Sequence, residues 1–170
     1  MADSEVLLRW RNDPLTRQNS HSTAVVDEAT HKAWLANSLS TPNRVIFIGE
    51  AEGIPVGTVR CDWSEGLVGY LSWTVAPEWR GQGYGTELVR GIIAAFTDRE
   101  FRAEIKAKNI PSLVIARRTG MCQIGQRDGV TFWQYTSHSH EKRERRNINS
   151  RHIPGRLRAF EMKTNEPKCT

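Results

Sequence analysis

The stretch Arg80-Gly81-Gln82-Gly83-Tyr84-Gly85 combines an arginine with three closely spaced glycines. An apolar, strand-like run precedes the stretch, and an apolar, helix-like run follows it. Glycine allows the backbone to approach a ligand closely, and the free N–H groups at the start of a helix attract an anion. Because Arg80 adds a forked cation at the same place, the pattern predicts a backbone cradle for a pyrophosphate group.

Two other phosphate-binding loops do not fit this stretch. A dinucleotide-binding fingerprint requires G-x-G-x-x-G, whereas the spacing here is G-x-G-x-G. A Walker loop ends in Gly-Lys-Ser/Thr, whereas Gly85 is followed by Thr86 and Glu87. An ordinary strand-to-helix turn remains the alternative, although such a turn needs fewer glycines.

The elements that must hold this loop follow from capping residues and apolar periodicity. The predicted helices cover about residues 3–12, 27–39, 83–97 and 109–118, and the predicted strands cover 45–51, 56–62, 67–75, 102–107, 121–126 and 130–136. Helices come first, a meander of strands follows, and strands then alternate with helices. This order predicts a mixed sheet in an α/β fold.

The chain of 170 residues is long enough for one domain, and its net charge of +5 is unevenly placed. Residues 138–170 contain nine Lys or Arg and four Asp or Glu, so residues 1–137 are neutral overall. We therefore predict a folded domain over 1–137 and a basic, partly irregular tail over 138–170, with no nucleic-acid face on the folded body. The sequence has no apolar run typical of a membrane span or a signal peptide, and its three cysteines are far apart. These features favour a cytoplasmic location.

Two segments together resemble the GNAT superfamily of acyl-CoA-dependent N-acetyltransferases. The first is Arg80-x-x-Gly83-x-Gly85, which is similar to the R/Q-x-x-G-x-G/A motif of that family. The second is Asn109-x-x-Ser112 with Gly120 behind it, which is similar to the family's N-x-x-A/S…G-F segment. The two motifs occur in the family's order and separation, and the resemblance covers roughly residues 5–136.

The resemblance implies a central mixed, mostly antiparallel sheet with helices on both faces, of which the family's usual first strand is missing here. It also implies acetyl-CoA as cosubstrate and no metal. Backbone near the end of the third strand and an asparagine across the cleft would hold the pantetheine arm, and the glycine stretch would hold the pyrophosphate. The residues assigned in this way are Thr74, Val75, Arg80, Gly81, Gln82, Gly83, Tyr84, Gly85, Thr86, Asn109 and Ser112.

The same resemblance implies catalytic residues. Glu104 precedes Asn109 at an offset where ribosomal-protein N-terminal acetyltransferases carry a glutamate that acts as general base through water. The alternative is a solvent-facing carboxylate on a strand. Ala116 stands where the family usually has a tyrosine that acts as general acid. Ser112 or Tyr84 could take that role, or the thiolate could leave without a proton, because a thiol with a pKa near ~8.5 is a fair leaving group.

The N-terminal segment carries the acceptor hypothesis. Residues 8–14 and the pair His31-x-x-Trp34 resemble acetyltransferases that act on nucleotide-linked amino sugars, in which these helices line the acceptor side. His31 is therefore a second catalytic candidate, and a surface or partly packed histidine is the alternative. Arg9, Arg11 and Arg17 could supply cations for a phosphate group.

We accordingly expect transfer of an acetyl group from acetyl-CoA to a small primary amine such as an amino sugar. A protein N-terminal acetyltransferase and a non-catalytic acyl-CoA-binding module are the alternatives.

The tail suggests two further alternatives. His138 and His140 lie beside Glu141 without a second ligand cluster, which favours a solvated segment over a metal site. The tail could also form a homodimer contact, or it could replace the missing first strand.

Overall fold

A computed structural model describes residues 2–64, 68–136 and 156–159. Its elements in chain order are α1 (Ala2–Asn12), α2 (Pro14–Asn19), α3 (Glu28–Ser40), β1 (Arg44–Ala51), β2 (Ile54–Trp63), β3 (Val68–Val75), the 3-10 turn η1 (Pro77–Trp79), α4 (Tyr84–Ala95), β4 (Glu100–Lys106), α5 (Ile110–Arg118), β5 (Cys122–Arg127), β6 (Val130–Tyr135) and β7 (Arg156–Ala159). The histidines considered as metal ligands at 138 and 140 lie outside the described residues.

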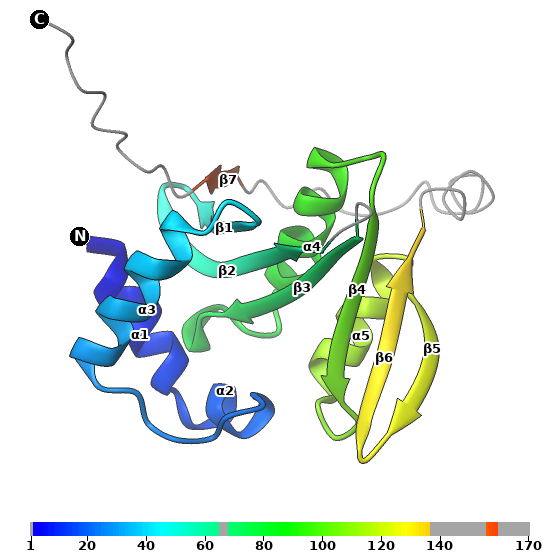
Figure 1. The fold of residues 1–170 in the computed structure, drawn as a ribbon, viewed down its shortest axis with the longest axis horizontal. Helices are drawn as coiled ribbons and strands as arrows, with labels where there is room; N and C mark the ends of the chain where they lie inside the picture. The colour runs from blue at the N-terminus through cyan, green and yellow to red at the C-terminus, as the bar shows by residue number, and fades with distance from the viewer. Residues whose placement is uncertain (1, 65–67, 137–155, 160–170) are drawn as a thin grey trace, which may run out of the picture.

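The strands form one sheet in the order β5-β6-β4-β3-β2-β1-β7. The β3–β4 pair is parallel, and the other neighbouring pairs are antiparallel (Figure 1). The predicted mixed, mostly antiparallel sheet is confirmed. The chain begins with helices, and the strand beside β1 comes from the tail, since Phe47 to Glu50 pair with β7.

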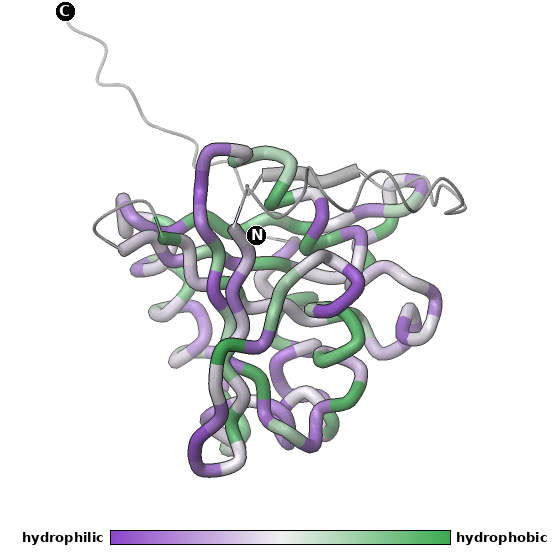
Figure 2. Tube along the Cα trace, turned by 90° about the vertical axis from the view of Figure 1, so that its right-hand side faces the viewer, coloured by the Kyte–Doolittle hydropathy of each residue, from purple (hydrophilic) through white to green (hydrophobic). Residues whose placement is uncertain are grey.

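Alternation along the strands divides the core between the two faces of the sheet. Ile46 packs in one cluster with Trp10 of α1 and Leu35 of α3, whereas its neighbours Val45 and Phe47 pack against the cluster that contains α4 and α5. Successive side chains of a strand point to opposite faces, so this arrangement places helices on both sides of the sheet. Figure 2 shows hydrophobic stretches along the strands and helices and hydrophilic stretches at the turns.

Capping residues set the helix boundaries that position the site. Asp27 caps α3 by accepting a hydrogen bond from Thr30 N at 2.8 Å. Asp13 caps α2, a six-residue helix that the apolar pattern does not predict, by accepting from Thr16 N at 2.9 Å. Because α2 buries none of its residues, it has no apolar face for a periodicity to reveal.

Candidate active site

The two central strands separate and leave an open cleft. The parallel pairing of β3 with β4 is confined to Val68–Tyr70 and Glu100–Arg102, and the strands diverge toward their carboxyl ends (Figure 1). The facing edges over Leu71–Val75 and Ala103–Lys106 line a cleft of about 900 Å³. Backbone groups on these edges need partners, and an extended ligand can supply them.

The glycine stretch forms the rim of this cleft at the start of α4. Gly83 is the N-cap residue with φ of +94°, and no side chain caps the helix. The first amide bonded within the helix is that of Thr86, which donates to the Gly83 carbonyl at 2.9 Å. The amides of Tyr84 and Gly85 precede it and have no helical acceptor. A Cβ atom added to Gly81 would meet nothing within 4 Å, so the backbone there is open to a ligand.

Gly85 serves packing. A Cβ atom at this position would lie 2.5 Å from Ile115 Cδ1 of α5 and 3.1 Å from Val75 Cγ2 of β3. The absence of a side chain therefore lets α4 approach α5 and β3 closely, which holds the rim of the cleft against the sheet.

The side chain of Arg80 is held by the N-terminal helices. Its Nη2 atom donates to Asp13 Oδ2 at 2.5 Å and to Thr16 Oγ1 at 2.9 Å. Burial would raise the pKa of Asp13, but hydrogen bonds from Arg80 and Thr16 outweigh burial, and the pKa lies below its ordinary value. Arg80 thus fixes the glycine loop to the start of α2.

The other predicted coenzyme residues collect at the cleft, with one exception. Asn109 caps α5 by accepting from Ser112 N at 3.3 Å, which leaves its amide N–H groups for a ligand. Gln82 is exposed and donates to the Glu78 carbonyl at 3.2 Å. The predicted coenzyme residues that line the cleft are Thr74, Val75, Arg80, Gly81, Gly83, Tyr84, Gly85, Thr86, Asn109 and Ser112.

Glu104 faces the cleft from β4 and has a partner that the sequence did not suggest. His21 Nε2, in the segment between α2 and α3, lies 3.4 Å from Glu104 Oε2. Nearby, Lys106 Nζ donates to the Gln18 carbonyl at 2.9 Å. These two contacts join the α2 region to β4 across the cleft. The Asp13-Pro14-x-Thr16 pattern was the available signal for α2, whereas the pairing of His21 with Glu104 depends on the tertiary fold.

His31 lies in a different environment from Glu104. The residue is 3% exposed, and its ring centroid is 5.6 Å from that of Trp34. Burial lowers the pKa of His31, although a hydrogen bond to the Ser4 backbone partly opposes the shift. Ala116, at the place of the family's tyrosine, is fully buried in the core.

The described residues contain no group of three or more potential metal ligands. None of the described helices combines the length and apolar character that crossing a membrane requires.

The separated strands and the glycine rim together form a cleft with unpaired backbone groups along both strand edges. A family model described as an acetyltransferase (GNAT) domain matches residues 1–122. The chain therefore belongs to the GNAT family of acetyltransferases. No curated protein matches the sequence.

Solved structures with the same fold include several acetyltransferases. Aminoglycoside acetyltransferase AAC(6')-Ib in complex with coenzyme A has a TM-score of 0.70 and 16% identity, covering 84% of this chain and 94% of that one. Spermidine N-acetyltransferase from Vibrio cholerae, with coenzyme A and spermine, has a TM-score of 0.71 and 11% identity over 81% and 92%. A ribosomal-protein-alanine N-acetyltransferase from Brucella melitensis has a TM-score of 0.62 and 28% identity over 79% and 94%.

The chain is an acyl-CoA-dependent N-acetyltransferase with acetyl-CoA as its cosubstrate. The residues present fit this cosubstrate, because free amides at the start of α4 suit a pyrophosphate and the unpaired strand edges suit an amide-bearing arm.

Proposed function

We propose that the protein acetylates the primary amine of a small molecule such as an amino sugar. The observation that carries this proposal is the pair of contacts that join the α2 region to β4, His21 with Glu104 and Lys106 with Gln18. An extended peptide needs an open groove along the cleft, and these contacts bridge it. A small amine can fit in the cleft beside them.

The two ends of the cleft would bind different parts of acetyl-CoA. The amides of Tyr84 and Gly85 would bind the pyrophosphate, and Arg80 would hold their loop in place through Asp13. The edges of β3 and the Asn109 amide would bind the pantetheine arm. When bound, acetyl-CoA supplies an acetyl group activated as a thioester.

Glu104 would act as the general base through a water molecule. The amine nitrogen bonds to the acetyl carbon as the carbon–sulfur bond breaks, and the proton that the amine loses passes to the carboxylate of Glu104. The carboxylate is half-exposed at the cleft, which leaves room for the water. Ser112 and Tyr84 both line the cleft and are the candidates to protonate the thiolate. We propose that His31 forms part of the cleft wall and has a structural role, because its ring packs against Trp34.

The second candidate is acetylation of a protein N-terminus. The 28% identity with the ribosomal-protein-alanine N-acetyltransferase supports it, and a terminal residue alone could enter the cleft past the two contacts.

A panel of amines assayed for thiol release from acetyl-CoA separates the two candidates. We expect turnover with amino sugars or similar small amines and none with peptides that begin with alanine or serine. Turnover confined to peptides would establish the second candidate. Binding of acetyl-CoA without turnover of any amine would favour a non-catalytic acyl-CoA-binding module.

A further inference from the structure

The acceptor side of the cleft is richer in cations than in carboxylates. Among the described residues that line the cleft, five are Lys or Arg and two are Asp or Glu. The cations are Arg11, Arg60, Arg80, Lys106 and Arg118, and the acids are Asp62 and Glu104. Asp13 pairs with Arg80, and Arg118 is the last residue of α5, the helix that Asn109 caps at the predicted coenzyme end. Arg11 and Arg60, together with Lys106 near Glu104, therefore set the positive charge that an acceptor meets.

Arg60 shares its carboxylate with a second arginine. Its Nε atom lies 3.0 Å from Asp62 Oδ2, while Arg44 forms an ion pair with the other oxygen of the same carboxylate. The group of two guanidinium ions and one carboxylate keeps a net positive charge. In the register of the sheet, Arg60 stands opposite Ser72, two residues from the predicted pantetheine site at Thr74.

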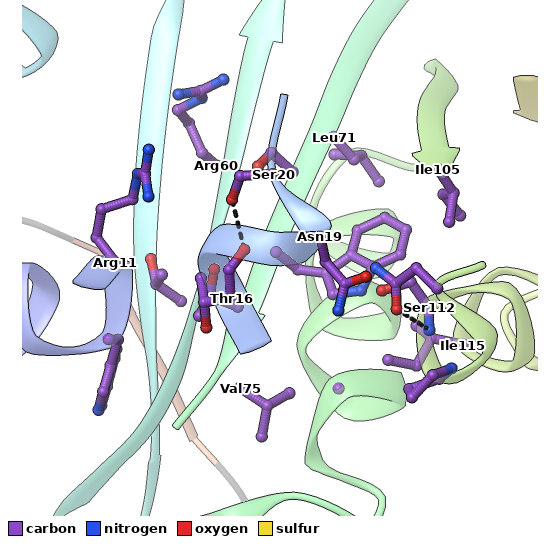
Figure 3. Close-up of a pocket in the computed structure, with 18 of the residues that line it drawn as sticks. Arg11, Thr16, Asn19, Ser20, Arg60, Leu71, Val75, Ile105, Ser112 and Ile115 are labelled. Carbon is purple, nitrogen blue, oxygen red and sulfur yellow. Dashed lines mark hydrogen bonds between the residues drawn. The ribbon is translucent and has the colours of Figure 1, made fainter. Parts of the chain in front are cut away.

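Arg11 has no carboxylate partner within ion-pair distance in the described part of the chain. Its Nη2 atom donates to the Ser22 carbonyl at 3.0 Å, and its Nη1 atom is buried without a hydrogen-bond partner. A partly buried guanidinium without a counter-charge is costly, and an anionic ligand would remove that cost. Figure 3 shows Arg11 and Arg60 on the side of the pocket away from Ser112 and Ile115.

We propose that the acceptor amine also carries an anionic group, a phosphate or a carboxylate, which Arg11 and Arg60 bind. This inference rests on the proposed function and specifies its substrate class. Guanidinium groups bind both anions through paired N–H donors. A polycationic amine would instead be repelled by the excess positive charge of these arginines. Among the described residues that line the cleft, Glu104 is the one carboxylate outside the Asp62 group that could attract such an amine.

Charge-matched acceptor pairs test the inference. The pairs are glucosamine with glucosamine 6-phosphate, ethanolamine with phosphoethanolamine, and alaninamide with alanine, and spermidine serves as the polycation. We expect the anionic member of at least one pair to have a KM at least roughly tenfold lower than its uncharged twin, because each arginine adds charge-assisted hydrogen bonds. Arg11→Gln and Arg60→Gln should each remove most of this preference, measured as the ratio of the two KM values within a pair.

Two further variants keep the test specific to these side chains. Arg11→Lys retains the charge and should retain part of the preference. Arg127→Gln removes an equivalent charge from the exposed end of β5 and should change nothing. Calorimetric binding of each acceptor to coenzyme A-loaded protein gives a readout without turnover. If an anionic amine binds through Arg11 but no amine is acetylated, the inference stands and the proposed function fails. If no anionic member exceeds its twin in binding or in KM, or if spermidine is preferred, the inference is overturned.

Discussion

Arg80 and Asp13 are 67 residues apart in the sequence, and their side chains lie 2.5 Å apart at the junction of the two halves of the site. The contact joins the loop that opens α4 to the residue that caps α2. A second ion pair, between Arg9 of α1 and Glu78 of η1 at 3.1 Å, runs in parallel with it. The N-terminal helices and the glycine loop are therefore held together by two ion pairs.

Asp13→Asn tests this connection, because asparagine can still cap α2 but cannot neutralise Arg80. We expect the free energy of unfolding to fall by about 1–2 kcal/mol at neutral pH, as for a partly buried charged hydrogen bond. The pKa of Asp13 is lowered in the folded state, so its contribution is present above the ordinary value of 3.8 and is lost as the pH falls through the lowered folded value. Denaturant unfolding at neutral and acidic pH measures both effects.

Asp27→Asn is the matched control, since Asp27 caps α3 and takes part in no ion pair with a described residue. Its effect at neutral pH should be smaller than that of Asp13→Asn. Equal effects of the two substitutions would mean that capping, and not the contact with Arg80, stabilises the junction.

Gly85→Ala should destabilise the protein through packing. The new Cβ atom would lie 2.5 Å from Ile115 Cδ1, and overpacking of this kind costs about 1–3 kcal/mol. Adding Ile115→Val removes the Cδ1 atom and should restore a large part of the loss. A double-mutant cycle from thermal unfolding measures this coupling, and strictly additive effects would contradict the packing role.

Gly83→Val should weaken acetyl-CoA binding by at least roughly tenfold, because a β-branched residue strains a backbone with φ of +94° at the amides proposed to hold the pyrophosphate. Calorimetric titration gives the affinity, and desulfo analogues that retain the pyrophosphate should show the same loss. Gly129→Val is the control, since Gly129 also has positive φ, at +75°, in a turn between β5 and β6. Unchanged affinity after Gly83→Val would refute the cradle.

Glu104→Gln should lower turnover at neutral pH by ~10²-fold or more, with partial recovery at higher pH as the free amine accumulates. Acetyl-CoA affinity should stay nearly constant, because the proposed coenzyme contacts lie elsewhere in the cleft. Glu100→Gln on the same strand removes a carboxylate that pairs with Arg102 and should keep turnover. Full activity of Glu104→Gln with the true acceptor would make Glu104 an ordinary strand carboxylate and return His31 to consideration.

His31 should make stability depend on pH. Its folded-state pKa lies below the ordinary 6.5, so the unfolded chain binds a proton first as the pH falls. The contribution is fully present above 6.5 and is lost as the pH falls toward the folded value. Melting temperatures between pH 5 and 8 should show this slope in the wild type and lack it in His31→Gln. Turnover of the variant at pH 8 should remain within roughly threefold, whereas loss of a general base typically costs ~10²–10⁴-fold.

Local signals were sufficient for most of the fold. Asp27 and Asn109 marked helix starts, and Pro111 fitted the first turn of α5. The sequence did not predict α2, which is too short for a periodicity. The tail was one of the alternatives for the missing first strand, and β7 of the tail pairs with β1, but the residues and register of β7 could not be predicted because the pairing joins distant segments. The prediction that acetyl-CoA binds without residues 138–170 stays a prediction, even though β7 extends the sheet.

The candidate site also has a part that the sequence could predict and a part that it could not. The glycine motif and Asn109 indicated the coenzyme end, because both patterns are contiguous in sequence. Neither the Asp13 partner of Arg80 nor the His21 partner of Glu104 could be predicted, since each contact joins segments brought together by tertiary packing.

The short pairing of β3 with β4 has a consequence for how the domain unfolds. Three register pairs connect a four-stranded portion, β7-β1-β2-β3, to a three-stranded portion, β4-β6-β5. The core cluster packed against α4 spans both portions, so within the sheet itself this junction is where local opening should be easiest. Amides on the inner edges of Leu71–Val75 and Ala103–Lys106 should exchange with solvent sooner than those inside either portion. A coenzyme bound between these edges would accept and donate hydrogen bonds as a further strand would, and it should slow amide exchange on both edges at once.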